Sequence, residues 1–173
     1  LPNAGKSTLL SVLSAARPKI GHYAFTTLVP NLGVVSYQPQ QSFVMADIPG
    51  IIEGAAQGKG LGTRFLRHIE RTKVLLFLIS SEHTDIKATY QMLQKELQVH
   101  NPALCTKPHL LAINKIDLLT PAKLAQRKKT LPPDTPFLAI SSLKKQGLVQ
   151  LKRHLWQLLH PTTHIPHQIS QDF

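Results

Sequence analysis

Two apolar runs limit the possible folds of this chain most strongly. They span residues 74–79 and 109–113. A strand that is apolar on both faces has to be covered on both faces, as in parallel sheets with helices above and below. Between the runs, residues 85–99 place apolar side chains at steps of three and four, which predicts a helix: Ile86, Tyr90, Leu93 and Leu97.

The rest of the chain continues this alternation. We expect further helices at residues 6–17, 63–72, 121–131 and 147–159, and a strand at residues 136–140. Two short runs, 33–37 and 42–46, predict an antiparallel hairpin with a four-residue loop at 38–41. Strands separated by helices imply βαβ units with right-handed crossovers. The sequence therefore predicts an α/β fold with a mostly parallel sheet.

Length and composition agree with one folded domain. A chain of 173 residues buries roughly 70% of the surface that its unfolded form exposes. Cys105 is the single cysteine, which excludes a disulfide framework and fits a reducing compartment. The longest apolar run is far shorter than the roughly 20 residues that span a bilayer. We expect a cytoplasmic monomer with no membrane segment.

The chain is strongly basic. Twenty Lys and Arg against nine Asp and Glu give a formal net charge of +11. The excess is concentrated after residue 120, where only Asp134 and Asp172 are acidic. Such a charge attracts polyanions such as nucleic acid. A solvated surface that keeps the protein soluble has the same composition, so both interpretations stay open.

A phosphate-binding motif lies at the start of the chain. Residues 4–8, Ala4, Gly5, Lys6, Ser7 and Thr8, match the second half of GxxxxGK[ST] and open a helix. In this motif backbone N–H groups surround phosphates and the lysine neutralises them, while the serine hydroxyl binds Mg²⁺. Leu1, Pro2 and Asn3 fill earlier positions of the loop, and the first glycine would fall before Leu1. We therefore expect the first strand of the sheet to be missing from this chain.

A second motif follows the hairpin. Asp47, Ile48, Pro49 and Gly50 read DxxG directly after a strand. There the carboxylate can reach the Mg²⁺ shell and the glycine N–H can reach a γ-phosphate. An ordinary strand end followed by a turn has the same pattern, so this motif is weak by itself.

A third motif selects the base. Asn114, Lys115, Ile116 and Asp117 read NKxD after the strand at 109–113. The aspartate carboxylate can accept hydrogen bonds from N1–H and the N2 amino group of guanine, whereas adenine offers no such pair of donors. A turn with a solvated lysine is the alternative. After the last strand, Ser141, Ser142 and Leu143 can offer backbone N–H groups to guanine O6, although serines at a strand end are also plain turn residues.

The order of the motifs is more informative than any one of them. A phosphate loop, DxxG, NKxD and a serine pair follow in sequence, and each later one stands at the carboxyl end of an expected strand. The carboxyl ends of parallel strands are where ligands bind in such sheets. Together the motifs predict a P-loop domain that binds GTP and GDP with Mg²⁺.

The residues also resemble the translation-factor-type GTPases, and among them the Obg family. FTTLVPNLGVV at 25–35 and DIPGIIEGAAQGKGLGTRFLRHIER at 47–71 are similar to the two switch regions of that family. The resemblance covers residues 1 to about 159 and implies a three-layer α/β P-loop GTPase domain, truncated at its N-terminus. We expect residues 160–173 to form a C-terminal tail.

The resemblance also implies roles for individual residues. Thr27 is the switch threonine that completes Mg²⁺ coordination beside Ser7 and Asp47, and its neighbours contact the nucleotide: Phe25, Thr26, Leu28 and Val29. The expected catalytic set is Lys6, Thr27, Gly50 and Asn3, and relatives with asparagine at the last position are often stimulated by K⁺. Ile51 stands where many GTPases carry a glutamine that orients water. We therefore expect slow intrinsic hydrolysis.

Three functions remain to be distinguished. The resemblance implies a GTP-hydrolysing switch that acts in assembly of the large ribosomal subunit and contacts that subunit or its RNA. Because Ile51 lacks a hydrogen-bonding group, a regulatory module that senses GDP or guanosine tetraphosphate, with incidental hydrolysis, is an alternative. A nucleic-acid-binding domain driven by charge alone is the third.

Overall fold

The computed structural model describes residues 3–15, 19–20, 31–47, 71–131 and 135–161. Helices and strands alternate along most of this part of the chain. In chain order the elements are α1 (Lys6–Leu13), β1 (Lys19–Ile20), β2 (Asn31–Gln38), β3 (Gln41–Asp47), β4 (Leu75–Ser80), α3 (Ile86–His100), η2 (Pro102–Leu104), β5 (His109–Asn114), η3 (Ile116–Leu118), α4 (Pro121–Lys129), β6 (Phe137–Ala139) and α5 (Leu148–Leu159).

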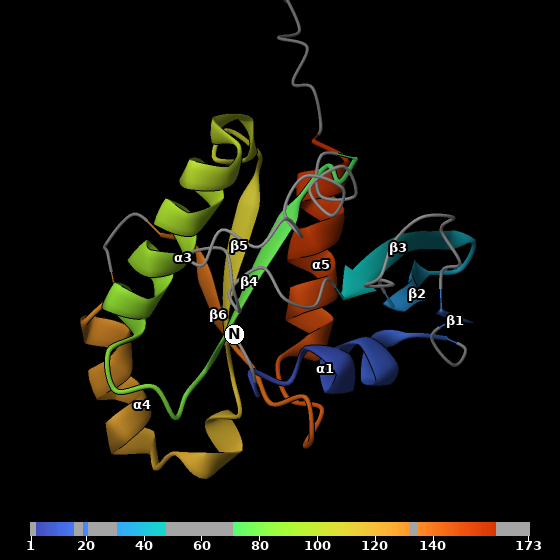
Figure 1. Cartoon of the computed structure of the whole chain (residues 1–173). Helices are drawn as coiled ribbons and strands as arrows, with labels where there is room; N and C mark the ends of the chain where they lie inside the picture. Colours follow the sequence, from blue (N-terminus) through green and yellow to red (C-terminus); the bar gives the residue numbers. More distant parts are fainter. Residues whose placement is uncertain (1–2, 16–18, 21–30, 48–70, 132–134, 162–173) are drawn as a thin grey trace, which may run out of the picture.

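The two apolar runs form adjacent strands of a parallel sheet. Its order is β4–β5–β6, and β4 pairs with β5 from Leu75 opposite His109 to Ser80 opposite Asn114. Figure 1 shows α3 and α4 on one side of this sheet and α1 and α5 on the other. The expected α/β fold with helices on both faces of a parallel sheet is therefore confirmed.

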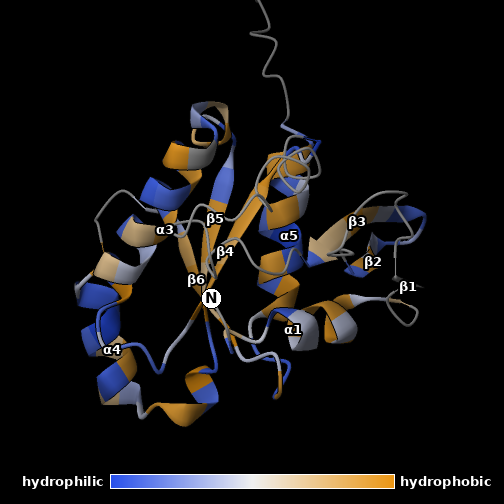
Figure 2. Ribbon diagram, viewed as in Figure 1, coloured by the Kyte–Doolittle hydropathy of each residue, from blue (hydrophilic) through white to orange (hydrophobic). Residues whose placement is uncertain are grey.

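The core lies in two layers, one on each face of the sheet. Alternate side chains of a strand point to opposite faces. Phe77 and Ile79 of β4 pack in the layer that contains α3, whereas Leu78 packs with α1 and α5. Figure 2 shows β4 as largely hydrophobic and β5 as hydrophobic except toward its ends. Each fully buried aliphatic side chain contributes about 1.5–3 kcal/mol, so both faces need apolar residues and the runs are continuous.

The hairpin is longer and its turn is tighter than expected. β2 and β3 pair antiparallel from Asn31 opposite Asp47 to Gln38 opposite Gln41, with an irregularity between Ser36 and Gln38. The expected four-residue loop is wrong, because Gln38 and Gln41 pair and leave only residues 39–40 in the turn. Gln40 makes this possible by adopting a φ of 62°.

Helix α1 ends four residues before the expected position. The sequence predicts a helix to residue 17, but Ser14 is extended, with ψ at 135°. Its hydroxyl donates to the carbonyl of Leu10 at 2.6 Å, and its backbone bridges to Val35 of β2. The next amide, that of Ala15, donates to the carbonyl of Val34 at 2.9 Å. Pairing with β2 therefore replaces the last turn of the helix.

The hairpin is also fastened to α5. The rings of Tyr37 and Trp156 stack with centroids 5.2 Å apart, and Lys152 Nζ donates to the carbonyl of Ser36 at 3.0 Å. The sequence did not indicate this contact, nor the short strand β1, which pairs with β2. Most of the expected helix at 63–72 lies outside the described residues.

The two sheets are separate in the described part of the chain. There β3 pairs only with β2, and β4 pairs only with β5. We expect the strand before the phosphate loop to lie beside the strands that end at Asp47 and Ser80. Among the described residues, β3 and β4 are each at the edge of their sheet, so each has one side without a ladder partner. Among the described helices, none has the length and apolar character needed to cross a membrane.

Candidate nucleotide-binding site

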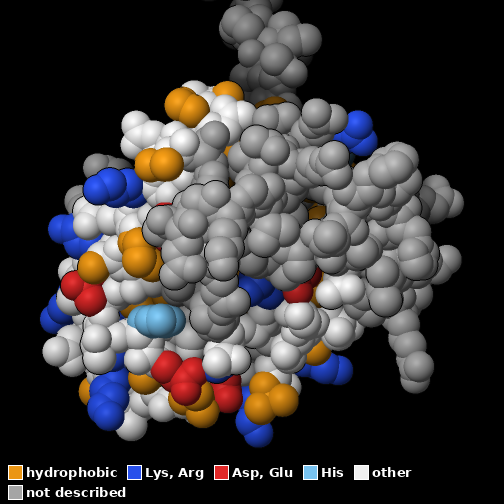
Figure 3. Space-filling model, in the orientation of Figure 1, with side chains coloured by type: hydrophobic (Ala, Val, Ile, Leu, Met, Phe, Trp, Pro, Cys, Tyr) orange, Lys and Arg blue, Asp and Glu red, His pale blue; other side chains and the backbone are white. Residues whose placement is uncertain are grey.

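The expected motifs gather where the strands end. Asp47 is the last residue of β3 and Asn114 is the last residue of β5. Ser141 follows β6, and Gly5 precedes α1. Figure 3 shows acidic side chains gathered at the lower end of the molecule, near the ends of β4 and β5 in Figure 1.

The phosphate loop has the backbone that its sequence predicts. Gly5 has a φ of 88°, and its carbonyl accepts from the amide of Leu9 at 2.8 Å, which starts α1 at Lys6. Asn3 also has a positive φ, 57°, and Ala4 is fully buried. The first amides of a helix have no partner within the helix and attract anions. The start of α1 therefore has the form of an anion site, with Lys6 at its first position.

At position 5 only glycine fits. A Cβ atom there would lie 2.5 Å from Nδ2 of Asn114. Besides its positive φ, the position is therefore closed to any side chain. The close approach brings the backbone of the phosphate loop against the NKxD motif.

Asn114 joins three loops. Its Nδ2 donates to the carbonyl of Ala4 at 2.9 Å, and its Oδ1 accepts from the amide and the hydroxyl of Ser142 at 3.0 and 2.9 Å. Its side chain is 1% exposed. All of its hydrogen bonds are therefore internal, and Asn114 acts on any ligand by holding the loops in place.

Asp117 is oriented by the loop after β6. Ser141 Oγ donates to Asp117 Oδ1, and Ser141 Oγ itself accepts from the amide of Lys144 at 3.0 Å. Asp117 is half-buried in the short helix η3, which follows Lys115. Among the described residues only Oδ1 has a hydrogen-bond partner, so Oδ2 can accept hydrogen bonds from a base.

The structure changes the expectation for the loop after β6. The amide of Ser142 donates to Asn114, and the amide of Ser141 donates to the carbonyl of Gln146 at 3.1 Å. These two N–H groups therefore hold the loop and do not face a ligand. Of the three expected donors to guanine O6, Leu143 is the one for which the described residues supply no partner, and its side chain is 72% exposed.

Ser7 and Asp47 form a pair of hard oxygen ligands. Ser7 Oγ donates to Asp47 Oδ2 at 2.7 Å, which connects α1 to the end of the hairpin. Asp47 is 7% exposed, and its Oδ1 atom is buried without a hydrogen-bond partner. A buried carboxylate oxygen needs a partner or a cation. Mg²⁺ prefers such oxygen ligands, so these two residues fit it.

Several expected site residues lie outside the described part. They include the first two residues, the switch segment around Thr27 and the remainder of the DxxG motif: Leu1, Pro2, Phe25, Thr26, Thr27, Leu28, Val29, Ile48, Pro49 and Gly50. Ile51 lies outside it as well. Their expected roles remain predictions.

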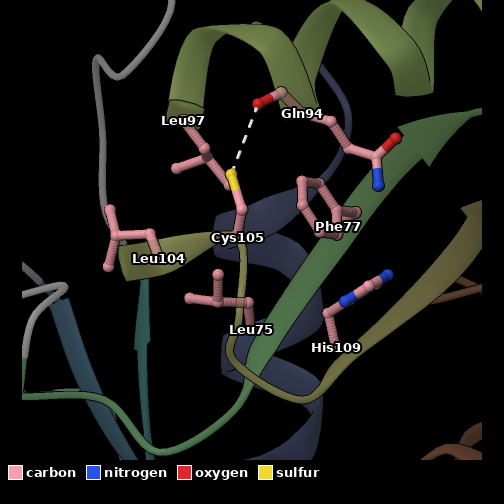
Figure 4. A pocket seen from close by; sticks show the side chains of 7 residues that line it. All are labelled: Leu75, Phe77, Gln94, Leu97, Leu104, Cys105 and His109. Atoms are coloured by element: carbon pink, nitrogen blue, oxygen red, sulfur yellow. Dashed lines mark hydrogen bonds between the residues drawn. The ribbon is translucent and has the colours of Figure 1, made fainter. Parts of the chain in front are cut away.

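A small apolar pocket lies at the opposite ends of the strands. Figure 4 shows Cys105 among the side chains that line it, with Sγ 3.9 Å from the carbonyl oxygen of Gln94. Leu75 and His109, the first residues of β4 and β5, contribute to the lining. The pocket is therefore distinct from the motif-bearing end. No group of three or more His, Cys, Asp or Glu side chains suited to a metal occurs among the described residues.

Sequence reasoning missed the contribution of the turn after β4. The amide of Ser81 donates to the carbonyl of Asn114 at 2.8 Å, and Ser81 Oγ donates to the carbonyl of Lys115 at 2.7 Å. Ser81 is fully buried. A serine between a strand and a helix has no distinctive pattern, so only its place beside the NKxD loop reveals this role.

Comparison with known proteins agrees with this geometry. The family model described as a 50S ribosome-binding GTPase matches residues 1–115. GTPase Obg of Cytophaga hutchinsonii is 58% identical over 159 residues, which cover 92% of this chain and 47% of that protein. GTPase Obg of Flavobacterium psychrophilum is 56% identical over 162 residues, with 92% and 48% covered. The chain thus spans about half the length of these relatives.

Solved structures share the fold. Era of Aquifex aeolicus bound to GDP and AlF₄⁻ superposes with a TM-score of 0.66 at 28% identity, covering 91% of this chain and 54% of that one. The G domain of the Thermotoga maritima iron transporter FeoB has a TM-score of 0.63 at 17% identity, covering 91% and 93%. Because the identity to FeoB is only 17%, this similarity shows the fold alone. From its motifs, its hydrogen-bonded loops and the family match, this chain belongs to the 50S ribosome-binding GTPases, with Obg proteins among its relatives.

Proposed function

We propose that this domain binds and hydrolyses GTP as a molecular switch with slow intrinsic turnover. The hydrogen bond from Asn114 to Ala4 is the observation that carries the proposal, because it unites the phosphate loop and the NKxD loop in one site. A nucleotide that bridges the two loops supplies phosphates to one and a base to the other. The proposed nucleotide-binding unit is residues 1–159, with 160–173 as a tail.

Asp117 supports the choice of guanine. A carboxylate oriented by Ser141 can accept from N1–H and the N2 amino group of guanine together. Xanthine carries a carbonyl oxygen where guanine carries that amino group, and an amide side chain can donate to it. Asp117→Asn should therefore weaken GDP binding and strengthen binding of xanthosine diphosphate. Fluorescence titration with both nucleotides, and with ADP as the control, tests this. An unchanged preference for GDP would contradict the assignment.

Mg²⁺ is the proposed cofactor, held by Ser7, Asp47 and Thr27. When bound, it neutralises phosphate charge and polarises the bond to the γ-phosphate. Lys6 and the first amides of α1 bind the phosphates, and Gly50 supplies a further N–H group. For Asn3 we propose a role in stimulation by K⁺. Equal rates of GTP hydrolysis in K⁺ and Na⁺ would contradict that role.

The proposed partner is the large ribosomal subunit or its RNA, in the cytoplasm. The description of the matching family supports this, and so does the charge distribution. Residues 135–161 contain no Asp or Glu, while Lys144, Lys145, Lys152 and Arg153 lie in the loop before α5 and on α5 itself. A basic surface without acidic residues attracts phosphate backbones.

Single-turnover GTP hydrolysis with and without large ribosomal subunits tests the switch. We expect the subunits to accelerate hydrolysis and to bind the GTP form more tightly than the GDP form. Small subunits at the same concentration serve as the control. If large subunits leave the rate unchanged, a module that senses GDP or guanosine tetraphosphate becomes the better description. Tight RNA binding that ignores the nucleotide would support a charge-driven nucleic-acid domain.

A further inference from the structure

The turn after β4 is fastened to the NKxD loop by three hydrogen bonds. The amide of Ser81 donates to the carbonyl of Asn114 at 2.8 Å, and Ser81 Oγ donates to the carbonyl of Lys115 at 2.7 Å. In the third hydrogen bond the NKxD loop is the donor: Lys115 Nζ donates to Glu82 Oε2 at 2.6 Å. Both the backbone and the ammonium group of Lys115 are thus held by one short turn.

Lys115 needs this support. Its φ is 63° and its ψ is 35°, the left-handed conformation that residues with a Cβ atom seldom adopt. Such a conformation persists only where the surroundings favour it. The carbonyl of Lys115 accepts from Ser81 and from the amide of Leu118 at 3.0 Å, so the backbone is held on two sides. The position of the long side chain depends on a separate contact.

Glu82 provides that contact and is itself oriented. Ser80 Oγ donates to Glu82 Oε2 at 2.9 Å, so the oxygen that binds Lys115 is fixed from the strand end. The hydrogen bond from Lys115, and then that from Ser80, lower the pKa of Glu82, which is therefore ionised at neutral pH. Among the described residues this is the ion pair that links the β4 turn to the NKxD motif.

We propose that Glu82 is a positioning residue for guanine-nucleotide binding that acts through Lys115. The inference rests on the proposed function, in which the NKxD motif that contains Lys115 binds the base. A lysine side chain has four rotatable bonds, so an oriented carboxylate reduces the conformational freedom that a ligand would otherwise have to remove. The nucleotide then meets a lysine that is already extended along one direction.

The expected effect is modest because the pair is partly exposed to water. The side chains of Lys115 and Glu82 are 30% and 57% exposed. Exposed ion pairs shift equilibria by factors of about two to five. Glu82→Gln should therefore raise the dissociation constant for fluorescently labelled GDP about two- to five-fold, mainly through faster dissociation.

A matched set of variants separates positioning from general damage. Glu96→Gln, on α3, removes a carboxylate elsewhere and should leave the dissociation constant unchanged. Lys115→Met keeps the aliphatic chain but removes the ammonium group. If Glu82 acts only through Lys115, then Glu82→Gln causes no further change in the Lys115→Met protein. An equal effect of Glu82→Gln in both backgrounds would overturn the proposal.

The dependence of GDP binding on ionic strength distinguishes an electrostatic role of Glu82 from a purely structural one. At about 1 M salt the Debye length falls to about 3 Å. The ratio of dissociation constants between Glu82→Gln and the unchanged protein should then approach one, whereas a misfolded loop would keep the ratio high. Circular dichroism melts establish that each variant folds, and Ser80→Ala provides a second, milder perturbation of the same carboxylate.

The outcomes also separate this proposal from the proposed function. If the unchanged chain fails to bind GDP, both are overturned. If it binds GDP and Glu82→Gln binds equally well at low salt, only the positioning role is overturned. A salt-dependent, Lys115-dependent loss supports it.

Discussion

The side-chain amide of Asn114 donates a hydrogen bond of 2.9 Å to the backbone carbonyl of Ala4, 110 residues earlier in the chain. This contact ties the loop after β5 to the loop before α1. It excludes water, because Ala4 is fully buried and Asn114 nearly so. The relative position of these two loops therefore depends on one buried amide.

Asn114→Ala should disrupt this arrangement. It leaves the carbonyl of Ala4 and the amide of Ser142 without partners, and each unsatisfied buried group costs about 1–3 kcal/mol. We expect the free energy of unfolding to fall by about 2–6 kcal/mol and GDP binding to be lost. Urea denaturation measures the first and fluorescence titration the second. As a control, Asn101→Ala removes the side-chain cap of η2 and should cost about 1 kcal/mol, with binding retained.

Asp47→Asn should separate Mg²⁺ binding from folding. The asparagine oxygen can still accept a hydrogen bond from the hydroxyl of Ser7. The substitution also removes the buried negative charge of Asp47, whose Oδ1 atom has no hydrogen-bond partner. We expect the free energy of unfolding without Mg²⁺ to be no lower than in the unchanged protein. The increase in GDP affinity on adding Mg²⁺ should vanish. Asp85→Asn, at the cap of α3, should retain that increase, and the same result for both variants would argue against a metal site at Asp47.

Gly33→Ala should test the contact between the hairpin and α1. A Cβ atom at Gly33 would lie 2.0 Å from Ser14 Oγ and 2.8 Å from Leu10 Cδ1. Overpacking of this kind costs about 1–3 kcal/mol. The midpoint of urea unfolding should fall accordingly. Adding Ser14→Ala removes the closest atom, so the double variant should recover part of the loss. Full additivity of the two single effects would contradict the packing seen here.

Tyr90→Phe should change the alkaline unfolding of the protein. Burial raises the pKa of Tyr90, although the hydrogen bond from Gln94 acts in the opposite direction. The folded chain then holds its proton more strongly than the unfolded chain, whose tyrosine titrates near pH 10. This contribution to stability is complete below pH 10 and is lost as the pH rises through the folded pKa. Melting temperatures from pH 8 to pH 11 should fall less steeply in the variant.

The same substitution has a second, pH-independent effect. The hydroxyl of Tyr90 lies 2.7 Å from Nε2 of His109 and accepts from Gln94 Nε2 at 2.9 Å. Its removal leaves two partners unsatisfied and should cost about 1 kcal/mol at pH 7. Parallel curves for the two proteins, merely offset from each other, would show that Tyr90 does not titrate with unfolding.

Elements whose cause is local were predictable from the sequence. The runs that became β4 and β5, and the spacing of Ile86, Tyr90 and Leu93 on α3, depend on periodicity alone. The ends of elements were less predictable, because another part of the chain determines them. Residue Ser14 leaves α1 to pair with β2, and Gln38 pairs with Gln41 across a two-residue turn.

The sequence alone was enough to predict an α/β domain with guanine-nucleotide motifs, because both follow from which residue types occur and in what order. The sequence did not reveal that the amides of Ser141 and Ser142 donate hydrogen bonds within the protein, or that Glu82 forms an ion pair with Lys115. Those relations join residues that are far apart along the chain and depend on directions of hydrogen bonds. The physical reason is that periodicity encodes which face is buried, whereas only packed strands and turns bring specific donors to specific acceptors.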